Sequence, residues 1–312
     1  MNSLFMNPLI GKLILGLTLI LGAHNSLAAE KISWKKNDEN RDRKIVSRVF
    51  APESSGKYPI VFISHGMLGS KNDMTYLGKY LAEHGFIVVH ASHPGSRTSD
   101  PIASFENVFS PEYWKIRPGD ISFLIDQLND LESVLQSKLG IDITIDRNRI
   151  GMTGHSFGGY TTLALAGAQV DQSADRQNQN FGDSRIKAFI AMSPAGKGSY
   201  GFSEDAFTKI TRPLFVMTGT KDREIQHSGD YKSRLDSFYD SPVGDKYALV
   251  LNGVGHAPFS YPAFNPRLKN WIKGTVREFQ LRFWQAYLND DPHSMEWLQD
   301  QQTTSYHEYL KR

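Results

Sequence analysis

The sequence predicts an α/β protein with a mainly parallel central sheet and helices on both faces. Short apolar runs alternate along the chain with segments whose apolar residues recur at helical spacing, as in βαβ units. Some of these runs, such as 59–64, are apolar at almost every position, which is typical of parallel strands covered on both faces. No internal repeat and no Pro/Ser-rich linker interrupts the pattern. A single domain is therefore the simplest interpretation.

The individual elements follow from these patterns. Strands are expected at Ile45–Phe50, Pro59–Ser64, Phe86–His90, Arg149–Thr153, Ile186–Met192, Pro213–Thr218 and Tyr247–Leu251. Helices are expected at Thr75–Glu83, Asp120–Leu135 with Asp120 as N-cap, Phe157–Ala168 and Leu268–Leu288. Loops or insertions are expected at Pro94–Pro118 and Asp171–Arg185, and a tail or short terminal helix at Asp290–Arg312.

Composition limits the classes of function. Of the 312 residues 40% are hydrophobic and 12% aromatic, which is enough for a large core. The formal net charge is only +2 and the charges are scattered, so no nucleic-acid partner is expected. Cysteine is absent, which excludes disulfides, thiolate nucleophiles and cysteine-bound metals. Histidines and carboxylates show no metal-binding spacing, so we expect no metal and no other cofactor.

Residues 1–28 have the layout of a secretory signal peptide. Lys12 is followed by the apolar run 13–22, and Ser26-Leu27-Ala28 offers a cleavage site. The run is short for a membrane span, and an uncleaved anchor is the alternative. We therefore expect an exported protein, periplasmic or secreted, with its α/β domain over residues 29–312.

The strongest chemical signal is Gly154-His155-Ser156-Phe157-Gly158. A G-x-S-x-G match alone is weak, because glycine and serine are common. Here it follows the expected strand Arg149–Thr153 and opens the expected helix Phe157–Ala168, which is the context of a nucleophile elbow. The turn would place Ser156 at the carboxyl end of the sheet, where open α/β sheets bind ligands. The sequence thus predicts Ser156 as a nucleophile.

A serine nucleophile requires a base and an orienting carboxylate, in the chain order Ser, Asp or Glu, His. His256 is the expected base, because it follows the strand Tyr247–Leu251 and a glycine turn. His293 and His307 lie in the polar tail and rank far below it. Asp222, just after the strand Pro213–Thr218, is the expected acid; Glu224 is its rival and Asp230 a distant third.

The tetrahedral intermediate of acyl transfer needs backbone donors for its oxyanion. We expect these to be the N–H groups of Phe157, directly after the serine, and of Met67, in the loop after the strand Pro59–Ser64; Leu68 is the alternative to Met67. His65 is expected to brace that loop, and His93 the floor of the site. His155 should point away from the serine and pack.

These motifs occur in order as Ser-His-Gly-Met-Leu-Gly (64–69), His-Pro-Gly-Ser (93–96), Gly-His-Ser-Phe-Gly-Gly (154–159), Thr-Gly-Thr-Lys-Asp (218–222) and Gly-Val-Gly-His (253–256). Over residues 45 to 290 the chain resembles exported bacterial members of the α/β-hydrolase superfamily, near the dienelactone-hydrolase and platelet-activating-factor-acetylhydrolase branch. Bacterial cutinase-like polyester hydrolases are also similar. The resemblance implies an α/β-hydrolase fold and supports the roles given above to Ser156, Asp222, His256, Met67 and Phe157. Dienelactone hydrolases proper use a cysteine nucleophile, which this chain lacks.

Aromatic side chains are concentrated in the expected site loops. Tyr113, Trp114 and Phe259 are the predicted substrate contacts, with Phe105, Phe109, Tyr200, Phe202, Phe207, Tyr261 and Phe264 nearby in the sequence. Such residues suit an apolar acyl or alcohol group, although about half of them would simply pack the loops. We expect a carboxylic ester of short to medium acyl chain, or a lipid ester, with transient contact to a membrane or lipid surface. The alternatives are a peptidase or acylaminoacyl hydrolase on the same triad, and a non-catalytic binding protein.

Overall fold

The structure is a computed structural model that describes residues 29–94, 96, 111–171, 178–223, 230–260 and 266–312. The expected signal peptide, the rival acid Glu224 and the aromatics Phe105, Phe109, Tyr261 and Phe264 lie outside these residues. Within the described ranges, no helix combines the length and the apolar character needed to cross a bilayer.

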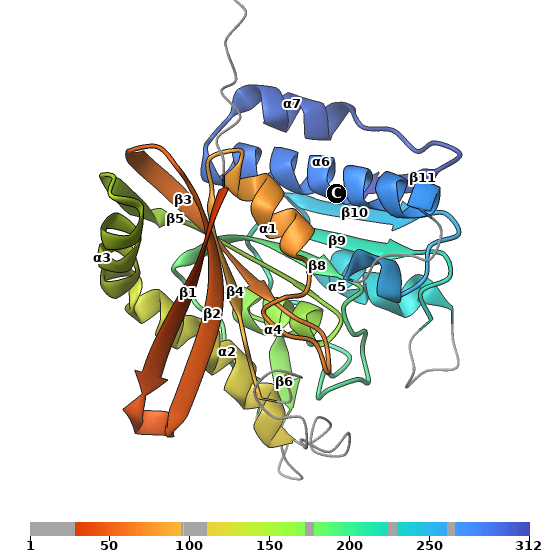
Figure 1. The fold of residues 1–312 in the computed structure, drawn as a ribbon. Helices are drawn as coiled ribbons and strands as arrows, with labels where there is room; N and C mark the ends of the chain where they lie inside the picture. The colour runs from red at the N-terminus through yellow and green to blue at the C-terminus, as the bar shows by residue number, and fades with distance from the viewer. Residues whose placement is uncertain (1–28, 95, 97–110, 172–177, 224–229, 261–265) are drawn as a thin grey trace, which may run out of the picture.

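The core of the fold is a nine-stranded sheet of order β1-β2-β4-β3-β5-β8-β9-β10-β11 (Figure 1). The strands are β1 (Ala29–Asp38), β2 (Arg43–Pro52), β3 (Gly56–Ser64), β4 (Ile87–Ala91), β5 (Ile143–His155), β8 (Ile186–Met192), β9 (Leu214–Gly219), β10 (Lys246–Leu251) and β11 (His307–Lys311). The strands from β4 to β10 pair in parallel, and β1, β2 and β11 are antiparallel at the two edges. The predicted α/β class with a mainly parallel sheet is confirmed.

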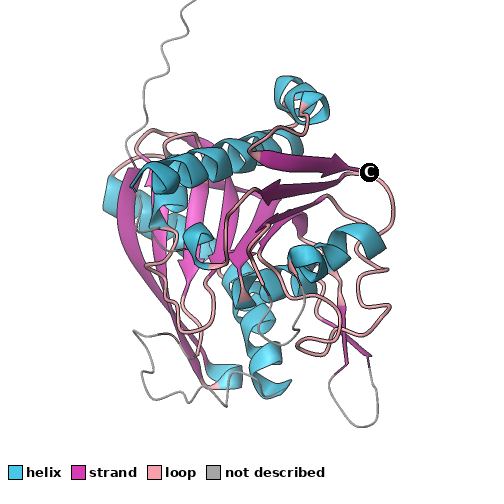
Figure 2. Ribbon diagram, turned by 90° about the vertical axis from the view of Figure 1, so that its right-hand side faces the viewer, coloured by secondary structure: helices cyan, strands magenta, loops and turns pink. Residues whose placement is uncertain are grey.

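Helices cover both faces of this sheet (Figure 2). One face carries α1 (Thr75–Ala82) and α6 (Pro266–Leu288), with α7 (Pro292–Asp300) against α6; the other carries α2 (Pro111–Asp126), α3 (Leu128–Leu139), α4 (Phe157–Ala166) and α5 (Asp236–Asp240). Side chains of β3 alternate between the two layers: Ile60 and Phe62 join the α3–α4 core, and Val61 and Ile63 join the α1–α6 core. This explains why the strand is apolar at consecutive positions.

The expected helix Asp120–Leu135, capped by Asp120, is wrong in its boundaries. The helix α2 begins at Pro111, within the segment expected to be a loop, and contains Pro118. Proline lacks an N–H and would leave the carbonyl of Trp114 without its helical donor. The hydroxyl of Tyr160 donates to that carbonyl at 3.4 Å instead. Asp120 lies inside the helix, where its buried carboxylate binds side chains from elsewhere in the chain.

The last residues, expected to be a tail or a short terminal helix, form the short helix α7 and then a strand that was not expected. After α7, β11 pairs antiparallel with β10 and becomes the edge strand of the main sheet. Tyr309 of β11 is buried in the α1–α6 core, and its hydroxyl donates to the carbonyl of Leu298 at 3.0 Å. The sheet pairing and this burial hold a segment whose own sequence is mostly polar. The sequence pattern likewise does not predict the strand β1, because its lysines obscure the inward-facing Ile32 and Trp34.

Candidate active site

Ser156 occupies a strained turn between β5 and α4. Its backbone has φ 59° and ψ −117°, a conformation that non-glycine residues rarely adopt. Its N–H donates to the carbonyl of Met192 at 2.9 Å, which ties the turn to β8. A Cβ on Gly158 would overlap the carbonyl of Ser64, and one on Gly154 would overlap the backbone of Gly158. The two glycines thus let three chain segments meet closely enough to hold the turn.

A chain of hydrogen bonds links Ser156 to two side chains from distant parts of the sequence. His256 Nε2 lies 2.8 Å from Ser156 Oγ, and His256 Nδ1 lies 2.8 Å from Asp222 Oδ1. Asp222 is fully buried, and Thr218 Oγ1 donates to its Oδ2 at 2.9 Å. Burial by itself raises the pKa of Asp222, but the hydrogen bond from His256 and the charge of Arg234 lower it to about 2. The structure therefore brings Ser156, His256 and Asp222 together, with the acid ionised.

The loop after β3 passes beside the serine. A Cβ on Gly66 would lie 3.3 Å from Ser156 Cβ, so the backbone of Gly66, directly before Met67, borders the nucleophile. Leu68 next to it has φ 54°, a second strained position. Phe157 is the first residue of α4, and the N–H groups of a first helical turn have no acceptor within the helix. The expected oxyanion donors thus lie on the two segments that flank Ser156.

Arg117, which the sequence did not mark, clamps this loop. Its Nη1 donates to the carbonyl of His65 at 2.5 Å and its Nη2 to that of Gly66 at 3.4 Å. Its guanidinium carbon lies 4.2 Å from the ring centroid of Phe157, a cation–π contact. The side chain is fully buried, and burial lowers the pKa of Arg117 to about 9. One cation therefore touches both segments that carry the expected oxyanion donors.

His65 braces the same loop, as expected, and His93 contacts His65 from just beyond the end of β4. His65 Nδ1–H donates to the carbonyl of Gly66 at 2.7 Å, and His65 Nε2 accepts from the N–H of His93 at 3.2 Å. His93 Nδ1–H donates to Asp120 Oδ2 at 3.0 Å, and Ser64 Oγ–H donates to His93 Nε2 at 3.0 Å. Burial lowers the pKa of His93 to about 4, so the ring is neutral at pH 7.

Asp120 is the buried anion that completes this network. It accepts from Arg43 Nη2 at 2.9 Å and from Arg41 Nη1 at 3.2 Å, in addition to His93. Burial raises the pKa of Asp120, but His93 and Arg43 outweigh burial and hold it below its ordinary value. The network ties α2 to the β1–β2 hairpin and to the end of β4.

His155 and Phe259 lie behind the expected base. His155 Nε2–H donates to the backbone carbonyl of His256 at 2.9 Å, and burial lowers the pKa of His155 to about 3. Phe259 is fully buried and stacks on His155 with ring centroids 6.2 Å apart, while Tyr76 donates its hydroxyl to the carbonyl of Phe259 at 2.9 Å. Phe259, a predicted substrate contact, packs behind His256 in the described structure.

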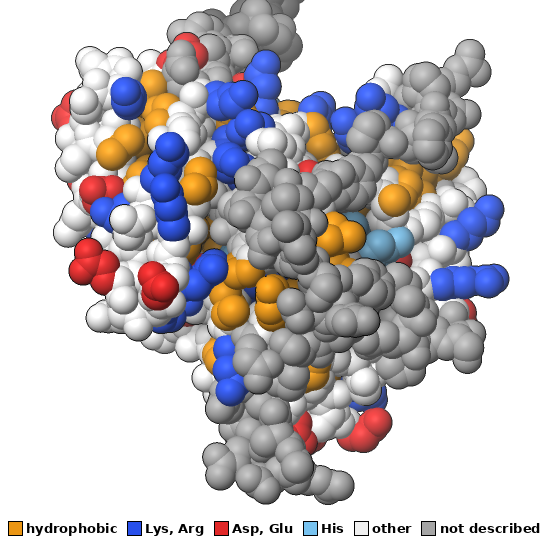
Figure 3. Space-filling model, turned by 60° about the horizontal axis from the view of Figure 1, so that its bottom comes forward, with side chains coloured by type: hydrophobic (Ala, Val, Ile, Leu, Met, Phe, Trp, Pro, Cys, Tyr) orange, Lys and Arg blue, Asp and Glu red, His pale blue; other side chains and the backbone are white. Residues whose placement is uncertain are grey.

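Half-buried aromatic side chains border the elbow on the α2 side. Tyr200 stacks on Phe157 with ring centroids 5.1 Å apart, and Trp114 meets Tyr200 edge-on at 6.2 Å. The buried Trp114 Nε1 has no hydrogen-bond partner among the described residues. Tyr113, one residue before it, is also half-buried. Figure 3 shows a face of the molecule on which apolar side chains gather beside a histidine.

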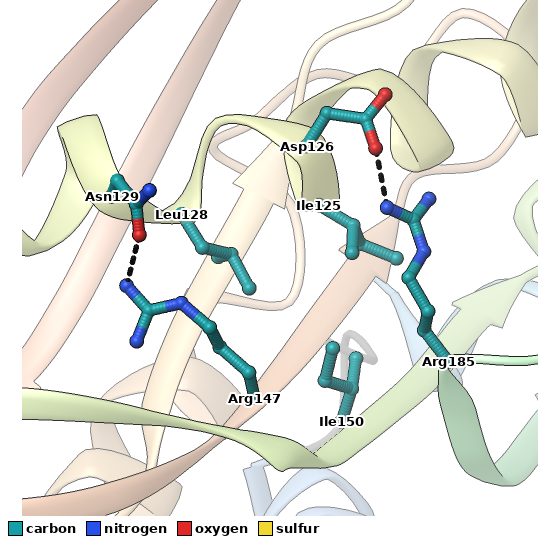
Figure 4. A pocket seen from close by; sticks show the side chains of 7 residues that line it. All are labelled: Ile125, Asp126, Leu128, Asn129, Arg147, Ile150 and Arg185. Carbon is teal, nitrogen blue, oxygen red and sulfur yellow. Dashed lines mark hydrogen bonds and ion pairs between the residues drawn. The ribbon is translucent and has the colours of Figure 1, made fainter.

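A separate cavity lies beside the middle of β5 and just before β8, away from Ser156. It is lined by Ile125, Asp126, Leu128, Asn129, Arg147, Ile150 and Arg185 (Figure 4). Its two guanidinium groups are paired within the protein, Arg147 with Asn129 at 2.5 Å and Arg185 with Asp126. In the described part of the chain, no cluster of His, Asp or Glu is arranged to hold a metal ion.

Comparison with known families agrees with this geometry. A model of the chlorophyllase family matches residues 23–199, more than half of the 312-residue chain. The chain belongs to the chlorophyllase family. The matched segment of this chlorophyllase-family protein includes the loop after β3 and the elbow at Ser156, and it ends before Asp222 and His256.

This chlorophyllase-family protein is also similar to curated esterases. Platelet-activating factor acetylhydrolase of Cavia porcellus is 25% identical over 245 residues, covering 68% of this chain and 51% of that protein. Cutinase 2 of Thermobifida cellulosilytica is 28% identical over 149 residues, covering 46% and 49%. Cutinase est2 of Thermobifida alba is 27% identical over 240 residues, covering 74% and 64%. The chain thus spans about half the length of the first two relatives, and the resemblance predicted from the motifs is confirmed.

Proposed function

We propose that the protein is a serine hydrolase that cleaves carboxylic esters through an acyl-serine intermediate. The hydrogen-bonded chain from Ser156 through His256 to Asp222 is the observation that carries the proposal. A serine hydroxyl is a weak nucleophile at neutral pH and needs a base within hydrogen-bond reach. His256 meets that requirement, and its side chain is 34% exposed, which leaves room for a substrate to approach.

In this mechanism Ser156 Oγ attacks the ester carbonyl carbon while His256 Nε2 takes the hydroxyl proton. Asp222 keeps the imidazole in the required tautomer and stabilises the imidazolium. The N–H groups of Met67 and Phe157 bind the oxyanion of the tetrahedral intermediate. His256 returns the proton to the departing alkoxide, which leaves as the alcohol. Water, deprotonated by the same base, then hydrolyses the acyl-serine and releases the carboxylic acid.

The substrate class follows from the walls of the site. Met67, Trp114 and Tyr200 are half-buried apolar groups beside the elbow, and such groups suit an apolar acyl or alcohol part. The names of the relatives, an acetylhydrolase and cutinases, support an ester bond as the target. We infer an ester with a short to medium acyl chain, or a lipid ester met by transient contact with a lipid surface. Residues 1–28 act as the export signal in this proposal.

A fluorophosphonate probe tests the nucleophile. The wild type should be labelled at Ser156, and Ser156→Ala should resist labelling and lose ester hydrolysis. His256→Ala should lower kcat by about 10²–10⁴, the usual contribution of general acid–base catalysis. Nitrophenyl esters of rising chain length, run beside a peptide substrate, separate an esterase from a peptidase. Full ester hydrolysis by Ser156→Ala, or turnover of the peptide alone, would contradict the proposal.

A further inference from the structure

A buried arginine adjoins the triad at the end away from the serine. Arg234 belongs to the short 3₁₀ helix η3 (Tyr231–Leu235), and its side chain is only 6% exposed. Its Nε lies 3.4 Å from Asp222 Oδ1, and its Nη2 lies 3.5 Å from His256 Nδ1. The guanidinium therefore faces both the carboxylate and the imidazole of the candidate triad.

Backbone carbonyls that follow two strands hold this guanidinium in place. Its Nη1 donates to the carbonyls of Ser193 at 3.3 Å and Pro194 at 3.0 Å, just after β8. Its Nη2 donates to the carbonyl of Arg223 at 3.1 Å, just after β9. An arginine side chain stays cationic throughout the pH range in which hydrolases act. The fold thus holds a permanent positive charge at a fixed place beside the Asp222–His256 pair.

Among the described residues, no other ionisable side chain around this pair replaces that charge. His155 packs against His256 with ring centroids 4.7 Å apart, but burial lowers the pKa of His155 to about 3 and keeps it neutral. Arg223 contributes its carbonyl, while its own side chain is exposed. Among the described residues, Arg234 is thus the cation that contacts the Asp222–His256 pair, and the anion of the pair is Asp222 itself.

We propose that Arg234 is a positioning residue that sets the acid limit of catalysis, by keeping Asp222 ionised and by opposing protonation of His256. The inference rests on the proposed ester hydrolysis. A positive charge close to an imidazole disfavours its charged form, and a positive charge close to a carboxylate favours the anion. The first effect keeps His256 unprotonated, and therefore able to accept the serine proton, at lower pH. The second keeps Asp222 an acceptor for the Nδ1–H of His256.

The test compares pH profiles of Arg234→Lys, Arg234→Gln and Arg234→Met with the wild type. Two readouts are used: kcat/KM for a nitrophenyl ester, and the rate at which a fluorophosphonate labels Ser156. The acid limb of each profile is the part where the rate falls as the pH falls. In the two neutral variants, Arg234→Gln and Arg234→Met, this limb should move by about one pH unit to higher pH. One unit below the wild-type midpoint, their rates relative to their own plateaus should be about tenfold lower than in the wild type. Arg234→Lys keeps the positive charge. Its acid limb should therefore stay at the wild-type pH, while its plateau rate should be lower.

Arg212→Gln is the matched control. Arg212 is a partly buried arginine that donates to the carbonyls of Asp183 at 2.6 Å and Ile186 at 2.5 Å, at the start of β8 and away from the triad. Its loss should leave the acid limb in place. Circular dichroism and thermal unfolding report whether each variant is folded.

Three results would overturn the proposal. The acid limb of the pH profile could stay in place in a neutral variant, the rate could fall by the same factor at every pH, or the neutral variants could fail to fold. The last would show that Arg234 serves the fold rather than the acid limit. Absence of ester turnover by a wild type that is still labelled would instead contradict the ester-hydrolase proposal. The labelling profiles would then still decide the role of Arg234.

Discussion

At the scale of single side chains, the hydrogen bonds around His256 allow one neutral tautomer. Its Nδ1–H donates to Asp222 and its Nε2 accepts from Ser156. The carboxylate is held by Thr218 and remains an acceptor, because the pKa of Asp222 is lowered to about 2. The reactivity of Ser156 therefore depends on Asp222 being an acceptor, and that dependence can be tested by an isosteric change.

Asp222→Asn should lower kcat by about 10³–10⁴ while the protein stays folded, because an amide can donate to Nδ1 and favour the wrong tautomer. Glu224→Gln removes the rival carboxylate and should leave kcat almost unchanged. Steady-state kinetics on a nitrophenyl ester compare the two variants. If the Glu224 variant suffered the larger loss, the acid would be assigned to Glu224.

Arg117 acts through the loop that it holds. Replacement by Met removes the donors to the carbonyls of His65 and Gly66, which frees the backbone around Met67. We expect kcat to fall by about ten- to a hundredfold with KM changed little, because oxyanion donors act mainly in the transition state. Arg212→Met, which removes a carbonyl-binding arginine elsewhere, should change neither constant. A rise in KM at constant kcat would contradict this role.

At the scale of elements, the strand β5, the elbow and the helix α4 act as one unit. The start of α4 packs so closely on the end of β3 that a Cβ on Gly158 would overlap the carbonyl of Ser64. The position of Ser156 is therefore a consequence of backbone contacts between elements. The same contacts bring the loop that carries Met67 beside the nucleophile.

Gly158→Ala should lower the free energy of unfolding by about 1–3 kcal/mol, the usual effect of overpacking, and should slow fluorophosphonate labelling of Ser156. Gly274→Ala is the control, because an added Cβ there meets open space on α6. It should leave labelling unchanged and raise stability by up to about 1 kcal/mol. Urea unfolding and labelling rates measure both effects; unchanged labelling in Gly158→Ala would count against the elbow geometry.

At the scale of the whole molecule, buried neutral histidines couple the fold to pH. Burial lowers the pKa of His90 to about 3, of His93 to about 4 and of His155 to about 3. In the unfolded chain these groups take up protons below about pH 6.5, but the folded protein does not. Their contribution to stability is therefore present above pH 6.5 and is lost as the pH falls.

The free energy of unfolding should consequently fall between about pH 6 and pH 4, by about 1.4 kcal/mol per pH unit for each histidine. The lowered pKa of Asp222 acts only below pH 3.8, and its contribution is lost as the pH falls toward about 2. Urea unfolding at several pH values measures the slope. His90→Gln cannot take up the proton. The slope of its unfolding free energy against pH should therefore be smaller by the contribution of one histidine, about 1.4 kcal/mol per pH unit. Stability that is constant over this range would contradict the expectation.

The sequence by itself determined the α/β class, most element positions and the order of Ser156, Asp222 and His256. Those features depend on apolar periodicity and on glycine turns, which are properties of a few consecutive residues. The catalytic roles of these residues remain a proposal. Tertiary structure decided the rest. Arg41 and Asp120 are 79 residues apart in the chain, and Arg234 reaches carbonyls after two different strands. Buried charged side chains pair with the groups that the fold brings near them. Local sequence pattern therefore could not mark Arg117 or Arg234, predict the buried network around Asp120, or place Phe259 in the core.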